Sequence, residues 1–441
     1  MGGKAPTTAH TQSPRGRTVI LLADTQSYRL DDFLAAAARL GVDVIVGSNR
    51  CHVLAELFDE QFLIVNFDHP REATEAIRDF TRGRRIDAVV PAGDRMAVVA
   101  AMAAEALGLA HNPVDAAEAA ANKRLMREAL ARAGVRAPAH QVFALDEPAE
   151  EVARVVAREA GGIGYPCVLK PLRLSASRGV IRADDPASFA RAHARVAALL
   201  RAPEIRIAKD PEDARLLVEE FVPGAEVAVE GLLDRGALRV LAIFDKPDPL
   251  EGPYFEETIY VTPSRLPRAA QDEVAGVTAA AARALGLVTG PVHAELRVNE
   301  RGAWLIEVAA RSIGGLCSRA LRFSLGMSLE ELILRHALGE GVAGIEREGQ
   351  ASGVMMIPIP RAGILREVRG VEEARRVPGV VEVTIDVKPG ETLVPLPEGA
   401  RYLGFLFARG ASPAEVEDAL RRAHRALSFE ISPQVPVARG A

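Results

Sequence analysis

The sequence predicts a multidomain protein with a doubly wound α/β lobe, a smaller α+β lobe and a β-rich C-terminal lobe. Three observations lead to this fold class. The chain has 441 residues, and a single core stops growing well below that length, so two to four lobes are expected. Strand-like apolar runs alternate with helical stretches near the start, as in parallel sheets. The region 353–429 is instead divided by Pro and Gly turns, which is typical of β-rich structure.

Composition excludes several classes of protein. The chain has 54 basic and 59 acidic residues, a net charge of -5 and no block of like charge, so neither nucleic acid nor a membrane is an expected partner. Cys51, Cys167 and Cys317 have no metal-ligand spacing and indicate a reducing cytoplasm rather than a disulfide framework. Residues 1–17 lack the apolar core of a signal peptide, and the apolar stretch 97–110 is too short to span a bilayer. We therefore expect a disordered tail on a soluble, cytoplasmic protein.

The first lobe is expected to be a parallel sheet covered by helices. Predicted strands lie at 19–23, 42–46, 62–65 and 87–91, and predicted helices lie at 30–40 and 72–81, followed by one that ends at Leu107. After the first strand the chain reads Asp24-Thr25-Gln26-Ser27-Tyr28, with none of the glycines of a dinucleotide-binding turn. This lobe is therefore expected to hold substrate rather than NAD.

A helix over 122–132, which Gly134 and Pro138 terminate, marks the start of a new unit. Its α+β lobe contains predicted strands at 168–170, 215–221 and 227–233, and a helix at 186–200. Further strands are predicted at 240–244, 259–262, 292–298 and 303–308, with helices at 328–338 and 413–427.

Two glutamates form the most informative pair in the sequence. Glu295 and Glu307 lie on two predicted strands and oppose each other if the reversal between them is centred on Arg301. Opposed like charges are unfavourable, whereas Mg²⁺ prefers one or two carboxylates together with substrate phosphates. The pair therefore predicts a nucleotide-bound Mg²⁺, with Mn²⁺ as the substitute ion. The alternative is a solvated hairpin face, which the apolar neighbours Leu305-Ile306 disfavour.

Lys170 ends an apolar strand, and a buried lysine requires a partner, for which a phosphate is a candidate. The loop from Ser175 to Val180 then offers hydroxyls, backbone N–H groups and the Arg178 guanidinium. Such loops can cover phosphates. Taken alone, the loop could also be an ordinary surface turn. The position of the loop directly after Lys170 favours a role in covering phosphate.

The stretch from Leu216 to Glu226 is an apolar strand that enters a Pro-Gly turn. We expect the backbone there to lack a sheet partner and to pair with an adenine edge, and the Glu226 carboxylate to suit ribose hydroxyls. A strand and turn with exposed acids is the alternative. Lys123 stands at a helix start, where it opposes the helix dipole, so an anion is expected nearby.

These motifs occur in an order that resembles the ATP-grasp superfamily over roughly residues 18–340. The resemblance is carried by Asn122-Lys123-x-x-Met126, Tyr165-Pro166, Lys170-Pro171, Ser175 to Val180, Glu219-Glu220-Phe221 with Gly224 and Glu226, and Glu307 with Arg311. The segments Phe244 to Pro249 and Phe255 to Tyr260, and the tail from Gly353 to Phe405, are similar to the L-amino-acid ligase group.

The resemblance implies an ATP-grasp fold and a role for each matching residue. It implies that the phosphates of ATP are bound by Lys123, Lys170, Ser175, Ser177 and Gly179, and that adenosine is bound by Glu219, Glu220, Phe221, Val222 and Glu226. It also implies catalytic roles for Lys170, Ser177, Arg178 and Arg311. Glu295 and Glu307 would be Mg²⁺ ligands, and Arg311 would neutralise charge in the transition state. His293, Lys246, Gly314 and Gly315 are expected to contact substrate. Ala309 replaces an Asn found in many superfamily members, which leaves the number of metal ions open.

The resemblance also implies four segments and a reaction. The segments are a tail (1–17), an N-terminal α/β domain (18–121), an ATP-grasp domain (122–340, with its lid at about 140–233) and a C-terminal α+β domain (345–430). ATP would phosphorylate a small-molecule carboxylate, and the amine of a second substrate, such as an amino acid, would attack the acyl phosphate. The alternatives are a purine-pathway or biotin-carboxylase-like ligase and a nucleotide-binding sensor without turnover. The sequence leaves the substrates and the oligomeric state open, and a homodimer is compatible with it.

Overall fold

The computed structural model describes residues 16–24, 27–49, 61–157, 163–206 and 210–433. The chain forms two compact units, one made of Met1–His111 with Arg322–Glu348, and the other of Asn112–Leu321 with Gly349–Ala441. Except for its last two residues, the tail expected at 1–17 lies outside the described residues, as do Thr25, Gln26 and Cys51.

The first unit is built on a parallel sheet with the strand order β3-β2-β1-β4. Its elements are β1 (Thr18–Leu22), α1 (Leu30–Leu40), β2 (Asp43–Ser48), β3 (Phe62–Ile64), α3 (Pro70–Phe80), β4 (Ala88–Pro91), α4 (Asp94–Ala106), the 3₁₀ turn η3 (Ser324–Gly326) and α11 (Leu329–Ala337). Ile20, Leu22 and Ile45 of the strands pack with Ile77 and Val99 of the helices in one core. The doubly wound lobe expected from the sequence is confirmed.

Helix α11 belongs to this first unit, although its place in the sequence put it in the segment 122–340. It contacts α1 and β4, and Arg39 Nη2 lies 3.2 Å from Glu331 Oε2. The buried Leu329, Leu332 and Ile333 give the helix an apolar face. The apolar pattern predicts that this face is covered, but it does not say which sheet covers it.

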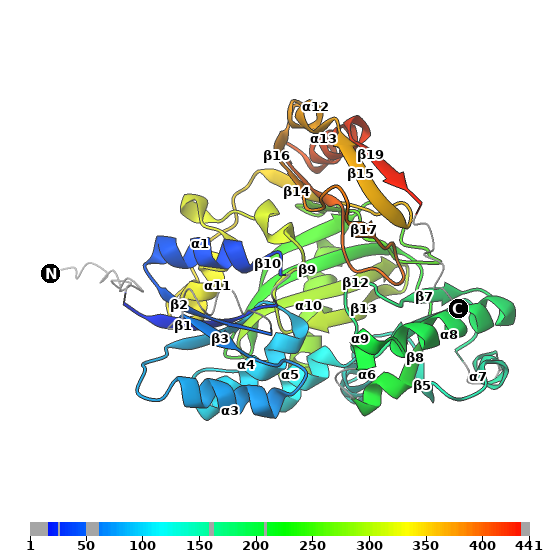
Figure 1. Cartoon of the computed structure of the whole chain (residues 1–441), viewed down its shortest axis with the longest axis horizontal. Coiled ribbons are helices and arrows are strands. Elements are labelled where there is room, and N and C mark those ends of the chain that lie inside the picture. Colours follow the sequence, from blue (N-terminus) through cyan, green and yellow to red (C-terminus); the bar gives the residue numbers. More distant parts are fainter. Residues whose placement is uncertain (1–15, 25–26, 50–60, 158–162, 207–209, 434–441) are drawn as a thin grey trace, which may run out of the picture. The chain divides into compact units, whose positions relative to one another are not determined.

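An eight-stranded antiparallel sheet is the centre of the second unit (Figure 1), with the order β13-β12-β9-β10-β11-β14-β18-β16. Its strands are β9 (Ala225–Asp234), β10 (Ala237–Lys246), β11 (Ile259–Thr262), β12 (Gly290–Asn299), β13 (Gly302–Ala309), β14 (Ala351–Ile357), β16 (Val380–Ile385) and β18 (Gly404–Gly410). The C-terminal strands therefore continue the sheet that carries Glu295, because β14 pairs with β11.

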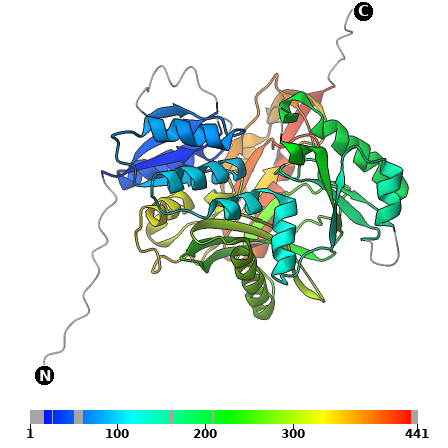
Figure 2. The ribbon, with the colours of Figure 1, turned by 90° about the horizontal axis from the view of Figure 1, so that it is seen from below.

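A separate four-stranded sheet, β5-β8-β6-β7, lies within the segment 140–233 that was expected to be a lid, and it is named the lid sheet for that reason (Figure 2). It comprises β5 (His140–Ala144), α7 (Ala149–Val156), β6 (Cys167–Pro171), β7 (Ile181–Ala183), α8 (Pro186–Leu200), α9 (Pro203–Arg206), the 3₁₀ turn η1 (Pro211–Ala214) and β8 (Arg215–Glu220). Phe189 of α8 packs on Leu169 and Val218 of the sheet. Strand β9, which the sequence analysis included in the lid segment, pairs instead with β10 and β12.

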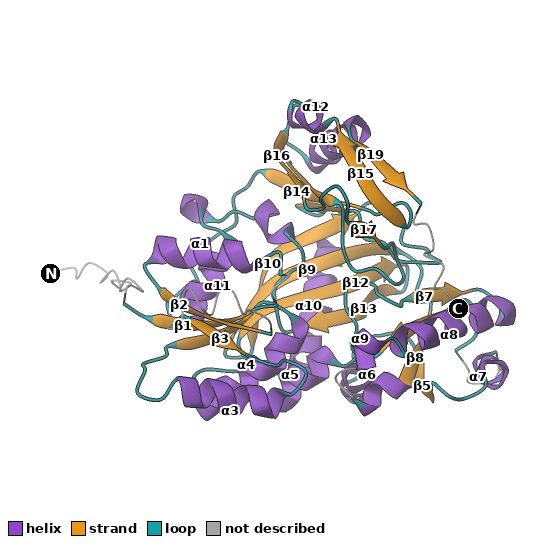
Figure 3. Ribbon diagram, viewed as in Figure 1, coloured by secondary structure: helices purple, strands orange, loops and turns teal. Residues whose placement is uncertain are grey.

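The remaining elements of the second unit are helices, a 3₁₀ turn and the strands of a three-stranded sheet, β17-β15-β19 (Figure 3). They are α5 (Val114–Ala121), α6 (Lys123–Arg132), α10 (Arg268–Leu285), η2 (Cys317–Ala320), β15 (Gly363–Arg369), α12 (Val371–Arg375), β17 (Thr392–Leu393), α13 (Pro413–Ala426) and β19 (Ser428–Ser432). Helices α5, α7 and α10 were not predicted from the sequence. None of the three begins with a side-chain cap, which is the usual start signal of a helix.

Cys167 and Cys317 are both buried, and neither is part of a disulfide. Within the described ranges, no helix has the length and apolar character that a membrane span requires.

Candidate active site

The hairpin of β12 and β13 places Glu295 directly opposite Glu307, as expected. Its turn alone would give a different register, because regular pairing from a turn between Asn299 and Gly302 would set Ile306 against Glu295. A β-bulge shifts the register and brings Glu307 into place. The carbonyl oxygen of Ile306 accepts a hydrogen bond of 2.5 Å from Arg127 Nη2.

Strand register also builds a row of alternating charge across three strands. Glu226 on β9 is paired with Lys246 on β10 and with Arg297 on β12. Directly opposed residues point to the same face of a sheet. Glu226 accepts a hydrogen bond of 2.8 Å from Lys246 Nζ and one of 2.9 Å from Arg297 Nε. Glu226 thus has two cationic partners, a role that was not predicted for it.

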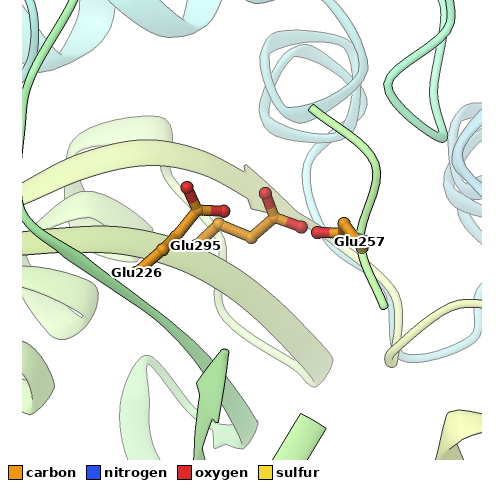
Figure 4. A group of neighbouring side chains, drawn as sticks. All are labelled: Glu226, Glu257 and Glu295. Atoms are coloured by element: carbon orange, nitrogen blue, oxygen red, sulfur yellow. The ribbon is translucent and has the colours of Figure 1, made fainter. Parts of the chain in front are cut away.

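Glu226, Glu257 and Glu295 converge, with one carboxylate oxygen from each lying within 4.8 Å of the others. Figure 4 shows the three side chains turned toward one another, with Glu257 coming from the segment between β10 and β11. The ammonium of Lys246 lies among them, bonded to Glu257 and 3.5 Å from Glu295 Oε1. It also lies 5.0 Å from the centroid of the Tyr260 ring.

Burial and mutual charge shift the pKa values of this cluster. Burial lowers the pKa of Lys246, but Glu226, Glu257 and Glu295 outweigh burial and raise it well above 10.5. Burial and the charge of Glu295 raise the pKa of Glu257 to about 7. Burial also raises the pKa of Glu295, but Lys246 and His293 reverse the shift and lower it well below 4.5. Glu295 therefore remains an anion at neutral pH, as a metal ligand must.

The donor set fits a hard divalent cation. Glu295 and Glu307 stand at opposed strand positions and would provide oxygen ligands, since Mg²⁺ binds through one or two carboxylates when phosphates complete its shell. Among the described residues, the acids that lie close enough together to share an ion are Glu226, Glu257 and Glu295, without Glu307. Each carboxylate of the opposed pair also has a lysine neighbour, Lys246 for Glu295 and Lys123 for Glu307. Anionic ligands and cations thus alternate on this side of the sheet.

Lys123 stands at the start of α6, where the Asn122 side chain caps the helix by accepting from Arg124 N. Lys123 Nζ donates to the carbonyl of Leu174 at 2.8 Å and lies 3.2 Å from Glu307 Oε1. The anion expected beside this helix start is therefore supplied by Glu307 in this structure. Lys123 also links the Glu307 hairpin to the chain just before the Ser175–Gly179 loop.

Lys170 has a carboxylate partner in the lid sheet. Its Nζ lies 2.7 Å from Glu219 Oε2, and Glu219 Oε1 accepts from Arg127 Nε at 2.6 Å. All three side chains are buried. Burial raises the pKa of Glu219, but the charges of Arg127 and Lys170 outweigh burial and lower it to about 2.

The backbone from Glu219 to Val222 differs from the expectation that it lacks a sheet partner. Glu219 and Glu220 lie in β8, between β5 and β6. The Glu220 N–H donates to the Ala139 carbonyl, the Phe221 N–H donates to the Pro166 carbonyl, and the Val222 carbonyl accepts from Arg297 Nη1. The strand pairing extends further along the chain than the Pro-Gly signal suggested. An adenine edge would need other backbone groups of this segment or an exchange of these bonds.

Phe221 contributes its ring to a stack of cations and aromatic groups. The Arg182 guanidinium lies 4.2 Å from its centroid and that of Arg297 lies 5.0 Å from it. The Phe255 ring lies 6.4 Å away, centroid to centroid. This stack joins the lid strand β7 to β12 of the central sheet.

The Ser175–Gly179 loop has an unusual backbone. Ala176 and Ser177 both have φ of 55°, and Gly179 has φ of 73°. A Cβ at Gly179 would lie 2.7 Å from Pro171 Cγ, so this position requires glycine. Arg178 Nε donates to the Glu398 carbonyl at 2.7 Å.

His293 is buried beside two carboxylates, with Nδ1 3.2 Å from Glu230 Oε2 and Nε2 3.6 Å from Glu295 Oε1. Burial and the Arg311 charge lower its pKa, but Glu230 and Glu295 outweigh them and raise it. The Arg311 guanidinium also donates to the Ser312 carbonyl at 3.0 Å. His293 thus touches a predicted metal ligand, on the face where substrate was expected.

Gly314 and Gly315 follow β13 and differ in their surroundings. Gly315 has φ of 58°, and a Cβ there would lie 3.0 Å from the Phe405 ring. Gly314 is exposed, and an added Cβ would meet nothing within 4 Å. Only Gly315 is a position at which packing and φ both favour glycine.

Four charged residues that contact the predicted site residues were not themselves predicted: Arg127, Glu230, Glu257 and Arg297. Glu257 lies in the Phe255 to Tyr260 segment, whose resemblance was noted without a role for the carboxylate. His293, Glu295 and Arg297 occupy every second position of one strand, so their side chains share a face of the sheet. This spacing could have identified Arg297 as a site residue. Arg127 and Glu230 gain their importance from partners more than 60 positions away in sequence, and no local pattern reveals such partners.

Comparison with protein-family models gives three matches along the chain. Residues 34–111 match the ATP-grasp N-terminal domain. Residues 163–320 match the ATP-grasp domain, and residues 355–432 match the L-amino acid ligase C-terminal domain 2.

Two curated proteins and one solved structure show the range of similarity. An uncharacterized protein of Sinorhizobium fredii is 28% identical over 72% of this chain and 63% of its own length. The alanine–anticapsin ligase of Bacillus subtilis is 29% identical over 60% of this chain and 58% of its own length. The chain thus spans about three fifths of these curated relatives. The crystal structure of L-amino acid ligase from Bacillus licheniformis has a TM-score of 0.80 and 27% identity, covering 95% of this chain and 99% of that one.

Proposed function

Because the chain belongs to the ATP-grasp superfamily, we propose that it is an ATP-dependent ligase that joins a carboxylate to an amine through an acyl phosphate. We further propose that both substrates are amino acids or close analogues. The family match of residues 355–432 and the similarity to alanine–anticapsin ligase and L-amino acid ligase support this choice of substrates.

The opposed pair Glu295 and Glu307 is the observation that carries the proposal. Each carboxylate has a lysine beside it, Lys246 or Lys123, which supports a binding site over the alternative of a solvated hairpin face. A hairpin that opposes two carboxylates is unfavourable by itself and becomes favourable when a cation is shared. Mg²⁺ held there with ATP would supply the positive charge that the transferring phosphoryl group requires.

The cations of the chain would hold two anionic substrates close together. A carboxylate and the terminal phosphate of ATP repel each other, so catalysis by positioning requires compensating charge. Lys123, Lys170 and Arg311 are the residues proposed for this role. Lys170 would exchange part of its contact with Glu219 for phosphate, while Arg127 continues to neutralise that carboxylate.

The second half of the reaction requires an uncharged amine and a site that excludes water. The amine attacks the acyl carbon and forms a tetrahedral oxyanion, which a nearby guanidinium such as Arg311 would stabilise. Collapse of this species breaks the bond between carbon and the phosphate oxygen, the phosphate leaves with the proton lost by the amine, and the amide remains. The lid sheet would shield the acyl phosphate from hydrolysis.

Release of ADP in the presence of different acceptors tests this proposal. The purified chain is incubated with ATP, Mg²⁺ and pooled amino acids, and the products are analysed by mass spectrometry. The expected product has the summed mass of two amino acids less one water, and ADP release requires both of them. ADP release that is equally fast without any amine would contradict the proposal. Preference for a purine precursor or for bicarbonate would instead favour another ATP-grasp branch.

A further inference from the structure

The Ser175–Gly179 loop is held at both of its ends by residues from outside the lid sheet. On its N-terminal side, Lys123 Nζ donates to the Leu174 carbonyl at 2.8 Å. On its C-terminal side, Arg178 Nε donates to the Glu398 carbonyl at 2.7 Å and the Gly179 N–H donates to the Pro397 carbonyl at 2.8 Å.

The conformation between these two ends needs such support. Ala176 and Ser177 are consecutive residues with positive φ. A side chain with a Cβ disfavours this region, and such residues persist only where their surroundings fix them. Within the loop itself, the Arg178 N–H donates to the Ser175 carbonyl at 3.2 Å and the Val180 N–H donates to the Ser177 carbonyl at 3.1 Å. The contacts with Pro397 and Glu398 therefore contribute to holding the turn.

The segment that supplies these two carbonyls, residues 394–399, is itself tightly formed. The Gly399 N–H donates to the Pro395 carbonyl at 2.9 Å. A Cβ at Gly399 would lie 1.9 Å from the Val394 carbonyl oxygen, so only glycine fits there. This 394–399 loop lies between β17 and β18 and thus belongs to the C-terminal part of the chain.

The Glu398 side chain attaches the 394–399 loop to the lid. Its carboxylate forms a two-point pair with Arg195 of α8, at 2.5 Å from Nε and 2.8 Å from Nη2. Arg195 also donates to the Tyr254 hydroxyl. The hydrogen bond from Arg195 lowers the pKa of Glu398, as expected for a carboxylate that is held as an anion. A single exposed ion pair contributes little, but bidentate geometry is the favourable case.

We propose that Glu398 is a positioning residue, which acts through Arg195 to keep the 394–399 loop against the Ser175–Gly179 loop and so holds that loop in the turned conformation that receives phosphate. The contacts of Glu398 and Pro397 support the positioning, whereas the role toward phosphate rests on the proposed function. The C-terminal part of the chain thereby takes part in nucleotide binding without touching the nucleotide.

Hydrogen–deuterium exchange of the full chain without nucleotide tests the positioning. In Glu398→Ala, we expect the amides from Arg178 to Val180 to exchange roughly tenfold faster, and Glu398→Gln to give a smaller increase. Arg195→Ala should reproduce the effect, and the double variant should add nothing, because both residues serve one contact. Glu391→Ala is the matched control, since its partner Arg401 lies in the same part of the chain. Unchanged exchange in Glu398→Ala, or an equal increase in Glu391→Ala, overturns the proposal.

Steady-state kinetics tests the consequence for the nucleotide. We expect the KM for ATP to rise roughly tenfold in Glu398→Ala while kcat changes much less, because the loop is present but poorly placed. A faster-exchanging loop with an unchanged KM for ATP would show that the contact does not serve the nucleotide and would overturn the proposal. If the parent chain neither binds nor consumes ATP, the proposed function fails, and exchange still decides whether Glu398 positions the loop.

Discussion

At the scale of single residues, Glu219 neutralises two buried cations, Arg127 and Lys170. Glu219→Gln keeps the shape of the side chain but leaves these charges without a partner. Removal of one member of a buried ionic group costs about 3–5 kcal/mol, so urea unfolding should show a loss of that size. Glu220→Gln serves as the control, because Glu220 is partly exposed and its ion pair with Arg301 is long, at 3.5 Å. This substitution should change the free energy of unfolding by no more than about 0.5 kcal/mol.

The same carboxylate makes stability depend on acid pH. Interactions in the folded protein depress its pKa from 4.5 to about 2. Its stabilising contribution is therefore complete above about pH 4.5 and is lost as the pH falls from about 4.5 toward 2, a change of about 3 kcal/mol. Urea titrations at several pH values should show a shallower acid loss in Glu219→Gln than in the parent. Parallel pH profiles for the two proteins would contradict this assignment.

Glu307→Gln tests the predicted metal pair. The substitution removes one anionic oxygen ligand and the partner of Lys123. Amine-dependent ADP release should fall about a hundredfold or more, as expected when a charged group that acts in the transition state is lost. Glu300→Gln, in the turn of the same hairpin, should retain activity. An active Glu307→Gln enzyme would exclude this residue from the catalytic site.

Single residues could be predicted where one local pattern was enough. Opposition of Glu295 and Glu307 followed from their distances to a turn, although the register depends on a bulge at Ile306 that the sequence did not reveal. The Glu257 carboxylate could not be placed, because it reaches the cluster from a segment outside the β-strands. Its position depends on the path of a loop, and period-two patterns do not describe loops.

At the scale of elements, α10 offers a matched pair of glycines. Gly276 is an exposed interior residue whose added Cβ meets nothing within 4 Å, whereas Gly286 ends the helix with φ of 82°. Gly276→Ala should stabilise the protein by about 1 kcal/mol through helix propensity. Gly286→Ala should destabilise it by about 1 kcal/mol, because a Cβ disfavours positive φ. Thermal unfolding of both variants should therefore give shifts of opposite sign.

Elements with strong periodicity and clear ends were predicted well. The apolar spacing of α1 and α8 defined both helices, and the alternation of β and α patterns gave the parallel sheet of the first unit. In contrast, α10 begins at Arg268, and the residue before it, Pro267, has no side chain that can cap the helix. Strand β9 was predicted from its apolar pattern, but it was assigned to the lid segment, whereas it pairs with β10 and β12 of the central sheet. Pairing partners depend on contacts that are distant in sequence, and a single strand pattern does not contain them.

At the scale of the molecule, the C-terminal strands are structural parts of the central sheet. Ile259 and Val261 of β11 are almost fully buried and lie in one core with β14. A chain that ends at Glu348 would expose this strand edge and its core, so we expect it to aggregate. Size-exclusion chromatography and circular dichroism, beside the full chain, provide the test. A soluble, cooperatively unfolding fragment would instead support the separate C-terminal domain that the sequence suggested.

The first unit is assembled from two stretches of chain, with residues 112–321, 210 in all, lying between them. During synthesis, the parallel sheet therefore leaves the ribosome long before the helix that packs on α1. At about 5–20 residues per second, α11 follows roughly 10–40 seconds later. Until then the apolar surface that α11 covers is open to solvent and available to chaperones. Ribosome-bound chains that stop before residue 322 should consequently be cleaved faster in this sheet than chains extended beyond residue 348.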